Sequence, residues 1–147
     1  MKRLIILFTS ILLCGCDHVK KDTTNPLKIK ATNVQRCLDS IYSNSKDWAC
    51  VGYKMILVKD DQNTKGLDSL HIGPNKIHLE KLPKEINLFK VDPNVNRTVY
   101  TRVSYKQISE TSIDVKIVIF FTYADWDYRL YKTDDKWMIE KVASGID

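Results

Sequence analysis

Alternation of apolar and polar residues in the C-terminal third constrains the fold of this chain more than any other feature. Every second residue from Ile113 to Phe121 is apolar, and Asp114 and Lys116 lie between them. The segments "DYRLYKT" and "KWMIEKV" flank Asp134-Asp135, a spacing typical of a tight hairpin. The pattern predicts four consecutive strands in an antiparallel meander. The residues expected on its inner face are Val99, Val103, Ile113, Val115, Ile117 and Ile119.

A helix is expected before this meander. Thr32-Asn33-Val34-Gln35 is similar to a capping box, and Val34, Leu38 and Ile41 then recur on one helical face. These signals predict a helix from about Asn33 to Ser45.

The segment "CVGYKMILVK" alternates like a half-buried strand, whereas residues 60–90 carry no clear pattern. Helix first and strands afterwards indicate the α+β class. We therefore expect one domain over residues 31–147, with an N-terminal helix packed on a curved antiparallel sheet of four to five strands.

The N-terminus has the features of an export signal. Lys2 and Arg3 precede an apolar run over residues 4–13, which is too short for a transmembrane helix of roughly 20 residues. Leu13-Cys14-Gly15-Cys16 then resembles the lipobox of bacterial lipoproteins. The resemblance implies cleavage between Gly15 and Cys16, with diacylglycerol and an N-acyl chain attached to Cys16.

Other interpretations of this segment remain open. Modification of Cys14 would place Leu13 where a lipobox has a small residue, so Cys16 is preferred. An ordinary signal peptide with an incidental cysteine is an alternative. A metal or redox pair lacks a second cluster of ligands in the sequence. Asp17 resembles the residue that retains lipoproteins of enteric bacteria in the inner membrane, facing the periplasm; the outer membrane is the alternative.

Charge is concentrated near the N-terminus. The formal net charge is +5, of which Lys2 and Arg3 supply +2 and the stretch 17–30 supplies a further +2. About +1 (5 − 2 − 2) remains for residues 31–147, which does not favour nucleic acid as a partner. Residues 16–30 are polar, contain Pro26, and are expected to form a tether between the lipid and the domain.

Two cysteines remain after processing, Cys37 and Cys50. In an oxidising compartment they are expected to form a disulfide that would pin the helix to the first strand. Two buried free thiols are the alternative.

The ending "YRLYKTDDKWMIEKVASG" resembles the closing hairpin of nuclear-transport-factor-2-like domains, which are cone-shaped α+β proteins. The resemblance implies a cone-shaped fold that encloses a cavity. This chain departs from the family pattern because only one convincing helix precedes the sheet.

The sequence contains no motif of a metal site, a phosphate loop or a nucleophile elbow, so neither a cofactor nor catalysis is expected. Asp125 and Asp127 bracket Trp126 and could form a carboxylate pair, although a solvated turn is the preferred interpretation. Tyr123, Trp126 and Tyr128 are candidates for a protein interface, because aromatic residues are enriched there; the alternative is that they belong to the core.

These observations predict a non-enzymatic, membrane-anchored periplasmic lipoprotein that binds a protein partner through its folded domain. One specific version is an immunity protein against a periplasmic toxin. The alternatives are an accessory subunit of an envelope, secretion or conjugation assembly, and a carrier of a small apolar ligand.

Overall fold

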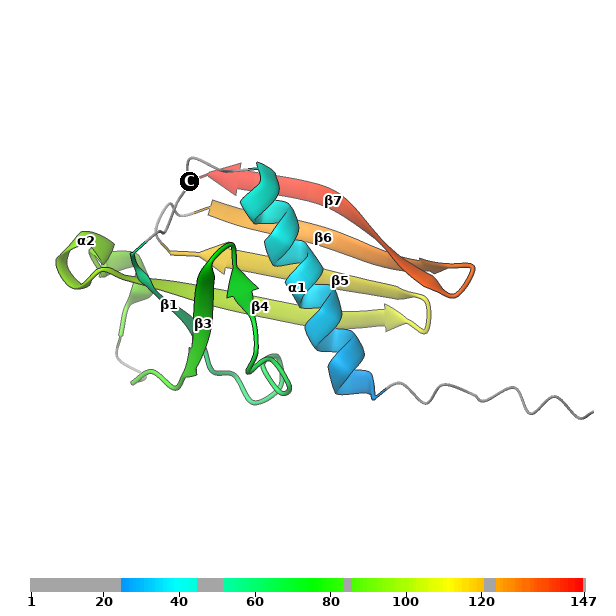
Figure 1. Ribbon diagram of the computed structural model, residues 1–147, viewed down its shortest axis with the longest axis horizontal. Helices are drawn as coiled ribbons and strands as arrows, with labels where there is room; N and C mark the ends of the chain where they lie inside the picture. The colour runs from blue at the N-terminus through cyan, green and yellow to red at the C-terminus, as the bar shows by residue number, and fades with distance from the viewer. Residues whose placement is uncertain (1–24, 45–51, 84–85, 121–123, 147) are drawn as a thin grey trace, which may run out of the picture.

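The computed structural model describes residues 25–44, 52–83, 86–120 and 124–146. One helix, α1 (Pro26–Asn44), packs against a curled sheet of seven strands, and this confirms the α+β class (Figure 1). The strand order is β2-β3-β1-β4-β5-β6-β7. The strands are β1 (Lys54–Val58), β2 (His71–Ile72), β3 (Asn75–Glu80), β4 (Thr98–Ser109), β5 (Ser112–Ile119), β6 (Ala124–Thr133) and β7 (Lys136–Ile146). A 3-10 turn at Leu88–Lys90 and the short helix α2 (Pro93–Asn96) precede β4.

The predicted sheet of four to five antiparallel strands was wrong in number and in direction. Strands β4 to β7 form the expected antiparallel meander, but β1 runs parallel to both β3 and β4. Met55, Ile56 and Leu57 are consecutive and all buried, so β1 is not the half-buried strand that the alternation suggested. Because successive side chains of a strand point to opposite faces, burial of these three residues means that both faces of β1 are covered, which favours a continuous apolar run.

Helix α1 begins at Pro26, seven residues before the predicted start at Asn33. Asn25 accepts a hydrogen bond from the backbone N–H of Leu27 at 3.0 Å, and Pro26 follows in the first turn. An Asn cap followed by proline is a favourable way to begin a helix. Residues 26–30, which were assigned to the tether, therefore belong to the folded domain.

The core lies between α1 and the concave side of the sheet. The predicted helical face is confirmed, since Val34, Leu38 and Ile41 are each at most 1% exposed. The predicted inner face of the meander is also confirmed as buried, and Tyr105 is half-buried against the same core. Burial of this apolar surface provides the main stabilisation of the fold, at about 25 cal/mol per Å².

Helix α1 also contacts both edges of the curled sheet, β2 and β7. The Gln35 side chain donates to the carbonyl of His71 at 3.0 Å and accepts from its N–H at 2.9 Å. The Arg36 guanidinium donates to the carbonyl of Trp137 in β7 at 2.6 Å. Adjacent residues of one helix thus bind the backbone of the first and last strands of the sheet. We call Gln35 and Arg36 the helix clasp.

The predicted Asp134-Asp135 hairpin is confirmed between β6 and β7. Thr133 pairs with Lys136, and the two aspartates between them have φ of 48° and 62°. Positive φ at both positions is the conformation of a type I′ turn, which favours Asn-Gly.

Replacement of Asp135 by glycine is expected to stabilise the domain. Glycine removes the cost of the left-handed conformation, whereas the exposed Lys132–Asp135 ion pair at 2.6 Å contributes little. The expected gain is about 0.5–1 kcal/mol in the free energy of unfolding, measured by urea denaturation. Asp61→Gly is the matched control, because Asp61 lies in a loop and does not have a positive φ. An equal gain in the free energy of unfolding there would show that the positive φ of Asp135 is not the cause.

Candidate functional site

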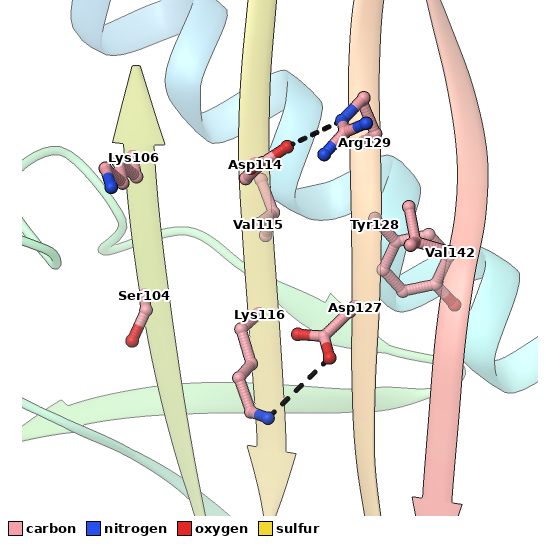
Figure 2. Close-up of a pocket in the computed structure, with 9 residues that line it drawn as sticks. All are labelled: Ser104, Lys106, Asp114, Val115, Lys116, Asp127, Tyr128, Arg129 and Val142. Carbon is pink, nitrogen blue, oxygen red and sulfur yellow. Dashed lines mark hydrogen bonds and ion pairs between the residues drawn. The ribbon is translucent and has the colours of Figure 1, made fainter. Parts of the chain in front are cut away.

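The sheet face that points away from α1 carries most of the organised charge of the meander. Alternation along the strands places one set of side chains against the helix and the other set on the opposite face, which is the face seen in Figure 2. We call this second set the outer face. Its members are Ser104, Lys106, Ile108, Asp114, Lys116, Asp125, Asp127, Arg129, Tyr131, Met138, Glu140 and Val142.

The strand register arranges these charges in rows across the sheet. Lys106 pairs with Asp114, Asp114 with Arg129, and Arg129 with Glu140, so the charge alternates in sign over four strands. In the next row, Ser104 pairs with Lys116 and Lys116 with Asp127. Opposite charges on directly facing residues stabilise a sheet by roughly 0.2–1 kcal/mol per pair.

Ion pairs connect the strands within these rows. Arg129 Nε lies 3.0 Å from Asp114 Oδ1, and Lys116 Nζ lies 3.7 Å from Asp127 Oδ2 (Figure 2). Lys116 also donates a hydrogen bond to Asp125, which accepts a second one from the N–H of Gly145 at 3.1 Å. The hydrogen bond from Lys116 lowers the pKa of Asp125, and the same bond raises the pKa of Lys116.

This geometry does not favour an acid–base role for Asp125 and Asp127. The two residues lie on strand β6 and not in the solvated turn that was the preferred interpretation. Both carboxylates are paired with Lys116, and the lowered pKa of Asp125 keeps that group ionised. A general acid at neutral pH needs the opposite shift.

An open hollow of about 370 Å³ lies among these side chains. Charged residues from β4, β5 and β6 line it, and Val142 closes it on the β7 side (Figure 2). Val142 is the extra residue of a β-bulge, because Tyr128 pairs with Lys141 while Asp127 pairs with Ala143. The complete lining is Ser104, Lys106, Asp114, Val115, Lys116, Asp127, Tyr128, Arg129 and Val142.

Exposed apolar side chains collect on the same face. Among the described residues, eight large hydrophobic side chains are exposed, and four of these belong to the outer face. They are Ile108 at 50%, Tyr131 at 39%, Met138 at 45% and Val142 at 53%. Charge rows bordered by exposed apolar residues form a surface suited to a macromolecular partner.

The predicted aromatic interface was wrong at two of its three positions. Trp126 is 6% exposed and Tyr128 is 2% exposed, and both belong to the core under α1. Tyr123 lies outside the described residues. The even positions of β6 from 124 to 130 point inward, which is why these aromatic side chains cannot contact a partner.

The structure gives no support to the predicted Cys37–Cys50 disulfide. Cys37 is a fully buried free thiol, and Cys50 lies outside the described residues. Burial raises the pKa of Cys37 to about 12, and nearby Arg36 offsets only part of that shift. A thiol in this environment stays protonated and unreactive at neutral pH.

Gly15, Cys16 and Asp17, which carry the lipobox prediction, also lie outside the described residues. Within residues 25–44, 52–83, 86–120 and 124–146, no helix combines the length and hydropathy needed to cross a membrane. In the same part of the chain, no group of three or more His, Cys, Asp or Glu side chains is placed to hold a metal ion.

Comparisons with known proteins define neither a family nor a relative. No protein-family model, curated protein or solved structure matches this chain. The fold and the outer face therefore have to be interpreted from their own geometry.

Proposed function

We propose that this chain is a membrane-anchored lipoprotein of the bacterial envelope that binds a protein partner through its outer face and catalyses no reaction. The observation that carries the proposal is the outer face itself, where rows of charge and four exposed apolar side chains lie together. Complementary charge on a partner would select it and fix its orientation, and the apolar residues would supply buried area.

The anchor rests on the N-terminal sequence. The charged start, the apolar run and the Leu13–Cys16 box support lipidation of Cys16, and Asp17 supports retention in the inner membrane, facing the periplasm. Two or three acyl chains hold a protein stably on a bilayer, whereas one does not. Because α1 begins at Pro26, a tether between Cys16 and the helix would have about nine residues, and an extended chain of that length spans at most about 30 Å.

The proposed partner is a protein delivered into or assembled in the periplasm. In its most specific form, the chain is an immunity protein that holds a toxin at the membrane surface. A cone-shaped, nuclear-transport-factor-2-like architecture is part of the same proposal. It is supported by the closing hairpin and by the helix that lies across the curled sheet.

Site-specific photo-crosslinking in cells tests the proposal. A photoreactive phenylalanine analogue replaces Val142 on the outer face, and a second variant carries it at Val95, which is 75% exposed in α2. We expect a discrete protein adduct in the membrane fraction from position 142 and none from position 95. Mass spectrometry then identifies the adduct.

Two variants connect the adduct to the proposed site and to the anchor. Arg129→Glu replaces the positive charge between Asp114 and Glu140, and we expect it to weaken the adduct at least tenfold. Cys16→Ser is expected to release the chain from the membrane. Equal adducts at positions 142 and 95, or a Cys16→Ser chain that stays membrane-bound, would contradict the proposal.

A further inference from the structure

The charge pattern of the outer face is self-complementary. The first row runs positive, negative, positive, negative from Lys106 through Asp114 and Arg129 to Glu140. Reversing the order of the strands inverts the sign at every position. A second copy of the same row, turned over and laid face to face on the first, therefore places opposite charges against each other at all four positions.

The symmetry that achieves this arrangement is a twofold axis that lies in the interface, parallel to the strands and between β5 and β6. Such an axis places β4 against β7 of the second copy and β5 against β6. Lys106 then meets Glu140, and Asp114 meets Arg129. Twofold interfaces of this kind, with the same patch on both subunits, are the commonest in soluble oligomers.

The neighbouring rows obey the same symmetry. In the second row, Lys116 on β5 meets Asp127 on β6 of the other copy. Beyond the first row, towards the hairpin turns, Met138 and Tyr131 form a cross-strand pair next to Ser112. The axis brings Met138 against Ser109, the residue of β4 that pairs with Ser112, and the exposed Ile108 lies next to it at the register shift of β4.

We propose that the outer face pairs two copies of this chain into a twofold dimer, with Lys106 of each copy against Glu140 of the other. The inference deepens the proposed function and rests on it in one respect, namely that the outer face is a binding surface. In the absence of another protein partner, a second copy of the chain occupies that face.

The size of the face indicates a weak dimer. Four strands about 4.8 Å apart, each about eight residues long, cover roughly 19 Å by 27 Å, or about 500 Å² in projection. A standard stable interface buries about 800 Å² on each partner. Confinement to one membrane raises the effective concentration of the two copies and favours a dimer of this affinity.

Charge reversal with rescue between copies tests the dimer. Two differently tagged versions of the full chain are co-expressed, and the fraction of one tag that co-purifies with the other is measured. Lys106→Glu paired with itself sets two carboxylates against each other at each contact between β4 and β7. Glu140→Lys paired with itself sets two ammonium groups against each other there. We expect each variant to reduce co-purification at least tenfold.

Co-expression of the Lys106→Glu chain with the Glu140→Lys chain is expected to restore co-purification to near the unsubstituted level. In this pair, the introduced glutamate of one chain meets the introduced lysine of the other. At the second contact, the retained Glu140 of the first chain meets the retained Lys106 of the second, so both contacts again join opposite charges. Neither a folding defect nor two lipid chains in one detergent micelle produces this pattern. Lys76→Glu, on the exposed side of β3, is the matched control and should behave like the unsubstituted chain.

The dimer would be overturned if the mixed pair co-purified no better than each variant with itself, or if Lys76→Glu had the same effect. If position 142 crosslinked to a different protein and the two tagged copies did not co-purify, the dimer would be contradicted and the proposed function would be supported. Association of copies with rescue, but without any heterologous adduct, would support the dimer and remove the heterologous partner from the proposed function.

Discussion

Raising the pH from 9 to 12 is expected to remove about 3 kcal/mol from the free energy of unfolding, mainly because of Cys37. The folded-state pKa of this buried thiol is about 12, whereas the ordinary value for a cysteine thiol is 9.0, and three pKa units at about 1.36 kcal/mol each limit the total effect to about 4 kcal/mol. The unfolded chain releases its proton first, so the stabilisation is complete below pH 9 and is lost as the pH approaches 12.

Other groups around Cys37 titrate in the same range. Burial also raises the pKa of Tyr105 on β4 and of Tyr128 on β6, and each adds to the alkaline destabilisation. Burial lowers the pKa of Lys30, two turns from the thiol on α1, and this shift acts in the opposite direction. The variant Cys37→Ala shows how much of the alkaline loss of stability comes from the thiol.

Urea denaturation at several pH values, in the presence of a reductant, measures the effect. We expect Cys37→Ala to lose roughly 1–2 kcal/mol at every pH because of the small cavity, but to show a much shallower decline above pH 9. If the free energy of unfolding fell equally above pH 9 in the unsubstituted chain and in Cys37→Ala, the effect could not be assigned to Cys37. If the unsubstituted chain declined only when reductant was present, Cys37 would be in a disulfide after all.

The hairpin between β6 and β7 shows how much of the outer face could be predicted from sequence. The Asp134-Asp135 turn fixes the register, so the pairs Arg129–Glu140 and Tyr131–Met138 follow directly from it. The bulge at Val142 breaks that register and leaves no signal in the sequence. The registers of β4 and β5 also depend on packing, and therefore the complete charge rows could not be derived.

The early part of helix α1 was missed because polar residues occupy buried positions. Lys30 is only 8% exposed: its Nζ lies over the ring of Tyr105, 5.2 Å from the centroid, and donates to the carbonyl of Gln62 at 3.2 Å. Asn33 is 1% exposed and also faces the sheet. A helix that buries a lysine and an asparagine does not show the apolar period by which helices are identified.

The parallel strands were missed for a different reason. β3 is six residues long and β2 only two, and the connection from β1 to β3 contains no helix that would signal a parallel crossover. The continuous apolar run Met55–Val58 was the available clue, because apolar residues at consecutive positions indicate a strand that is covered on both faces. Its position between β3 and β4 is set by tertiary contacts and not by local pattern.

Removal of the helix clasp is expected to cost about 3 kcal/mol. Arg36→Ala removes a charge-assisted hydrogen bond to the carbonyl of Trp137, worth roughly 1.5–3 kcal/mol in a partly buried site. Gln35→Ala removes two neutral hydrogen bonds to His71 in an exposed position, worth about 1 kcal/mol together. The two contacts lie on opposite edges of the sheet, so their effects should add within about 0.5 kcal/mol.

Urea denaturation of the two single variants and the double variant at pH 7 measures this additivity. Lys28→Ala, at an exposed position of the same helix, is the matched control and should change the free energy of unfolding by less than about 0.5 kcal/mol. Arg36→Lys should recover part of the loss, because it keeps a donor and the charge but not the planar guanidinium. If Arg36→Ala and Lys28→Ala were equally mild, α1 would be held by its apolar face alone, and the edges of the sheet would not depend on the clasp.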